Sequence, residues 1–153
     1  MTAFSEIECR GPWARDEVAK FLDDVLIPMR IAVNSSSGCP IVLSVWFLRD
    51  GNSLIGATRP TSTLIRCLEK SPECGFEIGP DTPPYHGVRG KAIATLEPER
   101  GGQVLDQLLI KYQGSLDSPL AVRLRKHAAD EVCFRLDPTL LITWDYAKRM
   151  ASA

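Results

Sequence analysis

The chain has 153 residues, of which 44% are hydrophobic and 24% are charged, and its net charge is −1. This length fits one domain spanning 1–153, and the composition excludes disordered, collagen-like and membrane-spanning classes of protein. Because the sequence has no basic block, we expect neither nucleic acid nor a membrane as a partner. The first residues lack the apolar segment of a secretory signal, so we expect a cytoplasmic protein.

The first part of the chain predicts one helix and then three strands. Apolar residues recur at helical spacing from Pro12 until Pro28, which predicts an amphipathic helix. The strands are expected at 29–34, 39–48 and 53–58. The second strand is apolar almost throughout, which indicates cover on both faces, either by a barrel interior and a helix or by a second subunit. Asp50-Gly51 predicts a tight hairpin between the second and third strands.

The rest of the chain predicts a short helix, two strands, two helices and two strands. The helices are expected at 62–70, 98–113 and 118–127, and the strands at 73–79, 88–97, 132–136 and 140–146. A proline-rich loop spans 79–87, and a turn is expected at Asp137-Pro138. The strand at 88–97 has small residues on one face, which would let another backbone, a partner chain or a flat ligand come close.

Short connections favour antiparallel neighbours, and a sheet of this size tends to curl to protect its edges. The predicted fold class is therefore mainly β with flanking α: a six- to seven-stranded antiparallel split barrel with helices packed outside. Residues 1–27 form the N-terminal helix region of this domain, and 28–150 form the barrel and its flanking helices.

The sequence contains no metal-ligand spacing and no familiar catalytic motif. Its five cysteines are an odd number without a C-x-x-C pair, which indicates reduced thiols, and no metal site is expected. His86 is better explained as a loop residue than as a metal ligand or a catalytic base. His127 is better explained as a solvated cation at the end of a helix. Catalytic residues therefore stay unknown.

Hydroxyl side chains gather around one arginine where a strand ends and a helix begins. They are Thr58, Arg59, Thr61, Ser62 and Thr63. A helix N-terminus offers free N–H groups and a favourable dipole, so an anion such as phosphate would be stabilised here. The alternative is that Ser62 or Thr63 only caps the helix and that Arg59 lies in water.

An aromatic pair precedes this cluster. We expect Val45, Trp46 and Phe47 to pair across the hairpin with the residues leading to Thr58, so that a flat ring could rest on this strand. For Trp46, a role as a core or interface aromatic is the alternative.

Four segments together resemble the pyridoxamine 5′-phosphate oxidase-like family of flavin-binding split barrels, over roughly residues 27–150. They are CPIVLSVWFLRDGNSLIGATRPTSTLIRCLEKSP, FEIG, GVRGKAIATLE and LLITWDYAKRM. The resemblance implies a homodimer that holds FMN, or a deazaflavin, at the subunit interface. It implies that Val45, Trp46 and Phe47 lie along the isoalloxazine ring and that Trp144 comes from the partner chain. For Trp144, a structural role on the strand face that it shares with Leu140 and Ile142 is the alternative. By the same resemblance, the residues that face the phosphate are Thr58, Arg59, Ser62 and Thr63.

The sequence departs from the family at the phosphate site. Many members have lysine at the position of Leu64 and arginine at the position of Ser62. Arg59 or Arg66 would have to substitute, the helix N-terminus would have to suffice, or the ligand would differ. Loss of one charged hydrogen bond costs about 1.5–3 kcal/mol, which weakens binding roughly tenfold to a hundredfold.

Three functions remain open. The first is an FMN-dependent oxidoreductase acting on a small-molecule substrate, with Tyr85, His86 and Arg89 on the substrate side. The second is a non-catalytic dimer that stores or senses a flavin or deazaflavin. The third is a haem-binding protein with His86 or His127 as axial ligand.

Overall fold

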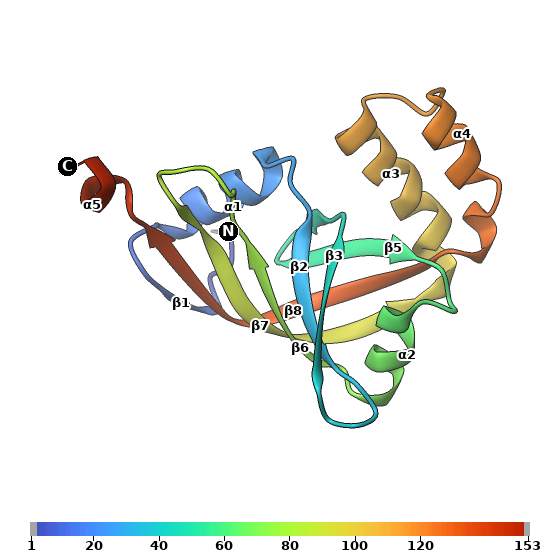
Figure 1. Ribbon diagram of the computed structural model, residues 1–153, viewed down its shortest axis with the longest axis horizontal. Helices are drawn as coiled ribbons and strands as arrows, with labels where there is room; N and C mark the ends of the chain where they lie inside the picture. The colour runs from blue at the N-terminus through green and yellow to red at the C-terminus, as the bar shows by residue number, and fades with distance from the viewer. Residues whose placement is uncertain (1–2, 152–153) are drawn as a thin grey trace.

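The computed structural model describes residues 3–151 and has one eight-stranded sheet, with α3 and α4 together near one end and α5 at the other (Figure 1). The strands are β1 Glu8–Arg10, β2 Met29–Asn34, β3 Pro40–Val45, β4 Leu48–Asp50, β5 Ser53–Thr58, β6 Glu73–Ile78, β7 His86–Glu97 and β8 Val132–Asp145. The α-helices are α1 Arg15–Asp24, α2 Thr63–Lys70, α3 Gly101–Gln113, α4 Pro119–Arg125 and α5 Ala147–Ala151. Short 3₁₀ turns, η1 Pro98–Arg100 and η2 Ala128–Asp130, precede α3 and β8.

The sheet follows the order β3-β2-β6-β7-β8-β5-β4, and β1 adds to β8 in parallel. All pairings on the main path are antiparallel, and the path ends at β3 and β4 without closing. The predicted class, mainly β with flanking helices in an antiparallel split barrel, is confirmed. The strand number is eight rather than six or seven, partly because the N-terminal region contributes a strand that its sequence pattern did not predict.

The last two predicted strands are one continuous strand, so the turn expected at Asp137-Pro138 is wrong. Lys91 of β7 pairs with Leu140, whereas the next residue, Ala92, pairs with Pro138, so β8 carries an extra residue there. Proline cannot donate to a sheet, and a bulge is where a strand tolerates it. The long β7–β8 ribbon therefore runs from one end of the molecule to the other (Figure 1).

The predicted strand 39–48 divides at Trp46 and Phe47. Only its last residues form the hairpin, with Leu48 opposite Ile55. Val45 instead pairs with Met29 of β2, which corrects the expectation that Val45, Trp46 and Phe47 pair with the strand that leads to Thr58. The chain bends here across Gly56 of β5, where an added Cβ would lie 2.7 Å from the Trp46 carbonyl oxygen. The tight turn itself is confirmed, with Gly51 at φ +62°.

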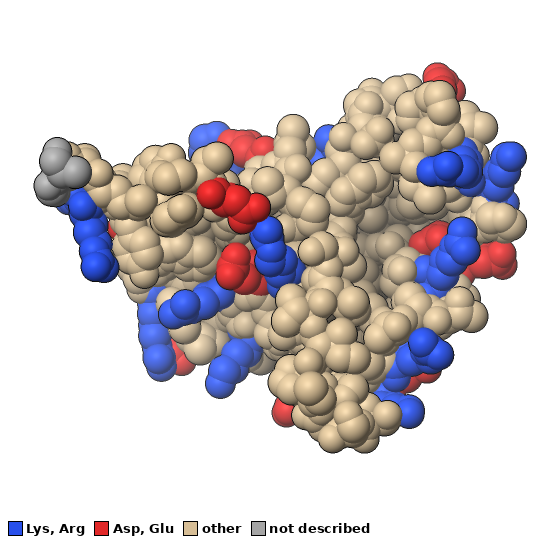
Figure 2. Space-filling model, in the orientation of Figure 1, with Lys and Arg blue, Asp and Glu red and all other residues tan. Residues whose placement is uncertain are grey.

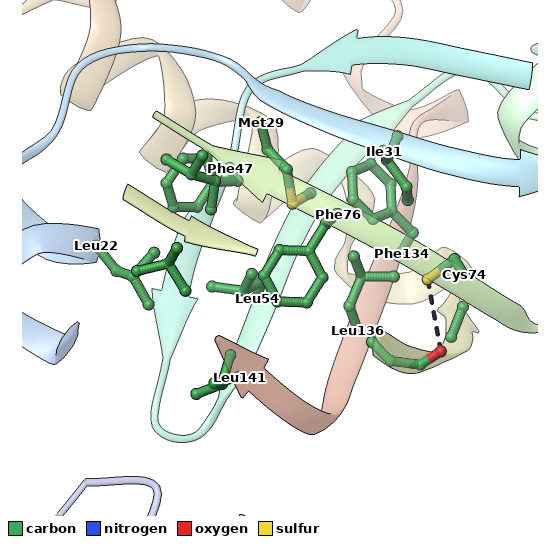
Figure 3. Packing of buried hydrophobic residues seen from close by; sticks show 14 of the residues in the cluster. Leu22, Met29, Ile31, Phe47, Leu54, Cys74, Phe76, Phe134, Leu136 and Leu141 are labelled. Carbon is green, nitrogen blue, oxygen red and sulfur yellow. Dashed lines mark hydrogen bonds between the residues drawn. The ribbon is translucent and has the colours of Figure 1, made fainter. Parts of the chain in front are cut away.

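Side chains from both halves of the sheet meet in one apolar core, closed on one side by α1 (Figure 3). The small face of β7 points into this core. A Cβ on Gly90 would lie 2.7 Å from the ring of Phe76, and Ala92 and Ala94 are buried. The small residues thus admit a core aromatic and a neighbouring backbone, since the Leu140 carbonyl oxygen would lie 2.3 Å from a Cβ on Gly90. Of the three expected neighbours, another backbone is confirmed, whereas a partner chain or a flat ligand would not reach this inward face.

No helix within residues 3–151 combines the length and the apolar character needed to cross a membrane.

Candidate functional site

A cavity of about 470 Å³ opens between the β3 and β5 ends of the sheet and the helices α3 and α4. Its polar lining comes from Ser44, Thr58, Arg59, Thr61, Ser62 and Glu131. Its apolar lining includes Val45, Trp46, Ala57, Leu105, Leu108 and Leu124. Figure 2 shows the surface hollowed between the α3–α4 lobe and the β2–β3 pair, with acidic and basic side chains near the outer rim. The chain therefore brings most of the predicted hydroxyl cluster and Trp46 to one cavity.

The bend between β3 and β4 places Trp46 in this cavity. Its indole stacks on the ring of Tyr112 of α3, with centroids 5.0 Å apart and planes 5° apart. The Tyr112 hydroxyl lies 3.1 Å from the carbonyl of Ile27 and 3.3 Å from that of Phe47, and it accepts from the Phe47 N–H at 3.3 Å. Tyr112 thus fixes both the backbone of the bend and the ring of Trp46.

The hydroxyl cluster lies at the start of α2, as predicted. The Ile65 N–H donates to the Ser62 hydroxyl oxygen at 3.2 Å, so Ser62 is the N-cap of α2. Its O–H proton can still be donated toward the cavity. Thr63 is the first residue of α2; it is exposed, and its side chain is not part of the cavity lining. Arg59 lines the cavity, whereas the other candidate cation, Arg66, does not.

Two positions that the resemblance assigned to the cofactor site, 47 and 64, are occupied by core residues. Phe47 is fully buried, and its ring lies 4.4 Å from the Lys111 ammonium nitrogen, so its side chain cannot contact a ligand in the cavity. Leu64 is 2% exposed and packs in the same core. A lysine at position 64 would therefore point into the apolar core rather than toward the cavity.

Glu131 is the charged residue of the cavity lining that the sequence did not predict. It precedes β8 and approaches the cavity because η2 ends there, and no local motif indicated this. Partial burial raises the pKa of its carboxyl, and the neighbouring Asp130 raises it further, while Arg59 acts in the opposite direction. Arg59 and Glu131 are thus close enough to interact electrostatically.

The other predicted site residues lie at the far end of the β7–β8 ribbon. His86 opens β7 and contacts the rings of Trp13 and Phe21, each with centroids 5.9 Å away. The Trp144 ring lies over Gly79 and Gly87, where an added Cβ would be 2.9 and 2.7 Å from it. Tyr85 precedes His86 and is exposed.

None of these residues lines the cavity of its own chain, and neither does Arg89, whose guanidinium lies 5.9 Å from the Trp144 ring. His127 is exposed and lines a separate, smaller cavity beside Arg59. Within residues 3–151 no group of histidine, cysteine and carboxylate side chains has the arrangement of a metal site.

No protein-family model matches the sequence, and no curated protein matches it significantly. Solved structures do match. A conserved hypothetical protein from Mycobacterium tuberculosis is 20% identical, with a TM-score of 0.76 over 91% of this chain and 89% of that chain. An F420 reductase is 22% identical, with a TM-score of 0.67 over 80% and 94%. A putative pyridoxamine 5′-phosphate oxidase from Listeria innocua is 18% identical, with a TM-score of 0.64 over 84% and 95%.

At these identities the likeness concerns the fold. The chain has the split-barrel fold that is shared with pyridoxamine 5′-phosphate oxidase-like proteins.

Proposed function

We propose that the protein binds FMN in the cavity between β5, α2 and α3 and uses it as the cofactor of an oxidoreductase. The observation that carries this proposal is that one cavity joins a fixed aromatic ring, Trp46, to the anion-binding start of α2. A flavin mononucleotide needs both, because it has a flat heterocycle at one end and a phosphate at the other.

The residues of the cavity fit the phosphate end of this ligand. Arg59 provides the positive charge, Thr61 and Ser62 provide hydroxyl donors, and the first turn of α2 provides N–H groups without intrahelical partners. Thr58 lies between these groups and the strand. Thr63 would contribute its backbone N–H rather than its side chain.

The opposite part of the cavity fits the ring end. Val45 and Trp46 supply a strand end and an aromatic ring, and α3 supplies an apolar wall through Leu105 and Leu108. The cavity volume lies within the roughly 300–1,000 Å³ of small-molecule sites. A deazaflavin is the alternative ligand, supported by the likeness to F420 reductase.

The bound flavin would supply the redox chemistry, so the protein needs no acid–base pair of its own. The role of the chain is to hold the phosphate, to keep the ring against the β3–β4 bend and to exclude water with α3 and α4. A small-molecule substrate would then enter from the open side of the cavity.

We also propose that the protein is a homodimer and that a second copy covers the outward face of the sheet. One row of paired residues crosses five strands of this face and is small or apolar apart from Lys91: Val42, Ala32, Gly75, Lys91 and Leu140. Val42 is 65% exposed. A row of this kind lets another sheet face approach closely and bury apolar area.

The next row of the same face alternates in charge. In the strand register, Arg30 lies opposite Glu77, and Glu77 lies opposite Arg89. Charges of both signs in one patch make the patch complementary to itself, which a two-fold interface requires. Trp144 and the substrate-side candidates Tyr85 and His86 would reach the cavity only as residues of the partner, and this contribution is part of the proposal.

The experiment is a titration of the purified protein with FMN, followed by tryptophan and flavin fluorescence. We expect binding, and we expect Arg59→Met to weaken it roughly tenfold to a hundredfold. The matched control is Arg66→Met, which removes an exposed arginine outside the cavity and should leave the dissociation constant unchanged. Equal effects of the two variants, or no response to FMN and deazaflavin alike, would refute the proposed site.

Enzyme activity is tested separately from binding. The flavin-loaded protein is reduced chemically and mixed with oxygen and with a panel of small acceptors. Steady turnover with any acceptor supports an oxidoreductase. Inertness toward all of them would instead support a protein that stores or senses the cofactor.

A further inference from the structure

The ionisable groups of the cavity cancel each other. Among the cavity-lining residues within 3–151, the charged side chains are Arg59 and Glu131, one of each sign. Arg59 is also the group that opposes the raised pKa of Glu131, so the two interact across the cavity. A phosphate dianion would therefore enter a site with no net positive charge while Glu131 is ionised.

Among the described residues, the charged groups that act on the Glu131 carboxyl are Arg59 and Asp130, so Arg59 is the cation of this set. Asp130, next to it, is acidic, and His127 lies with Asp130 in the adjoining cavity. Arg100, at the start of α3, is paired with Asp50 and Glu97.

Arg125 of the neighbouring α4 is similarly engaged, since it is paired with Asp106 of α3. Among the cavity-lining residues within 3–151, Arg59 is thus the cation, and Glu131 adds a negative charge that a ligand phosphate would meet in the same cavity.

Resting on the proposed function, we propose that FMN binding is coupled to the uptake of one proton by Glu131. The proton comes from solvent and converts the carboxylate into a neutral carboxyl group. The positive charge of Arg59 is then no longer offset by a carboxylate and attracts the phosphate, and the Glu131 O–H becomes a donor for an oxygen of the ligand. Glu131 would thereby determine at which pH the cavity accepts a dianionic ligand.

Electrostatics determines the direction in which FMN binding shifts the protonation of Glu131. Two like charges a few ångströms apart in a partly buried site repel, so the dianion favours the protonated form of Glu131. Burial already raises the pKa of this carboxyl, which reduces the cost of protonating it. Affinity for FMN should fall as pH rises above the pKa of Glu131 in the free protein. The fall should end where Glu131 is ionised in the FMN complex as well.

The test measures FMN binding by calorimetry at pH 7.5 in buffers with different ionisation enthalpies, which gives the number of protons taken up. At this pH the phosphate of FMN, with a pKa near 6, is already mostly dianionic. The wild-type protein should take up a fraction of a proton approaching one. Glu131→Gln should take up none and should bind FMN roughly tenfold more tightly.

Two controls isolate the effect. Glu69→Gln removes the same charge from the exposed side of α2 and should match the wild type in affinity and proton uptake. Riboflavin, which lacks the phosphate, should bind without proton uptake in every variant.

The outcomes separate the two proposals. If FMN binds with equal proton uptake in the wild type and in Glu131→Gln, the role of Glu131 is refuted while the flavin site stands. If neither protein binds FMN between pH 5 and 8, the proposed function and this inference are both refuted. Urea unfolding of Glu131→Gln checks that the variant is folded.

Discussion

The indole ring of Trp46 stacks on the phenol ring of Tyr112, with centroids 5.0 Å apart and ring planes 5° apart. The same phenol hydroxyl contacts the carbonyl of Ile27, which precedes β2, and the carbonyl of Phe47, which follows β3. One side chain of α3 therefore orients the aromatic wall of the cavity and ties the bend of the sheet to the helix. The cavity is shaped before any ligand arrives, which lowers the entropy cost of binding.

Tyr112→Phe should retain the ring stack and lose the hydroxyl. Because the Ile27 carbonyl and the Phe47 N–H in a partly buried place lose their partner, we expect the free energy of unfolding to fall by about 1–2 kcal/mol. Urea denaturation measures this. Tyr146→Phe, at an exposed tyrosine, is the control and should stay within about 0.5 kcal/mol of the wild type. Equal stabilities of the two variants would contradict the bracing role of Tyr112.

Leu64→Lys should harm the fold and leave flavin binding no stronger. Leu64 is 2% exposed in the core, so a lysine there would bury an unpaired ammonium group and lower the free energy of unfolding by at least about 3 kcal/mol. Leu64→Met, similar in volume, should cost less than about 1.5 kcal/mol. A Leu64→Lys protein with wild-type stability and tighter FMN binding would show that position 64 faces the cavity after all.

Val42→Arg should convert the proposed dimer into a monomer. Val42 is 65% exposed at the centre of the β3 edge, and an arginine there would place a bulky charge in the row that a second copy is proposed to cover. Ile110→Arg changes an aliphatic residue that is 55% exposed on α3 and should leave the dimer intact. Sedimentation velocity at micromolar concentration distinguishes the two, and a monomeric wild type would contradict the proposed interface.

Stability should decrease in alkali because of two buried thiols. Burial raises the pKa of Cys74 to about 11, and burial with the nearby Glu97 raises that of Cys133 to about 11. The folded chain therefore holds protons that the unfolded chain, with an ordinary thiol pKa of about 8.5, releases. This contribution is fully present below about pH 8.5 and is lost as pH rises toward 11.

Urea denaturation at pH 8 and pH 10.5 measures the effect. The Cys74→Ala/Cys133→Ala double variant should lose less stability over this interval than the wild type, whatever its stability at pH 8. An identical pH dependence in the two proteins would show that these thiols are not the cause. The Cys74 thiol also donates to the Ala92 carbonyl at 3.6 Å, as Figure 3 shows.

Most elements follow from local patterns in the sequence. The 3.6-residue and two-residue periods predicted α1, α2, α3, α4 and most strands, because each amphipathic segment must bury one face. Local chemistry also predicted the Asp50-Gly51 turn and a cap of α2 by Ser62 or Thr63, of which Ser62 has that role. These features depend on neighbours within a few positions, which the sequence contains.

Other features depend on partners far away in the chain. The strand β8 passes straight through Pro138 because β7 lies beside it over its whole length and a bulge absorbs the proline. The small face of β7 turned inward because Phe76 needs the space above Gly90. No local pattern records which of two faces a distant ring will occupy.

The site divides in the same way. The sequence by itself determined that hydroxyl groups and an arginine stand before a helix, since capping and helix dipoles are local effects. The sequence also predicted Trp46 near this cluster but left a core or interface role open. Only the tertiary structure decided that Trp46 lines the cavity, that Phe47 and Leu64 belong to the core, and that Glu131 lines the same cavity as Arg59. Those outcomes depend on how α3, α4 and the bend at the end of β3 pack together, and packing is set by the whole chain at once.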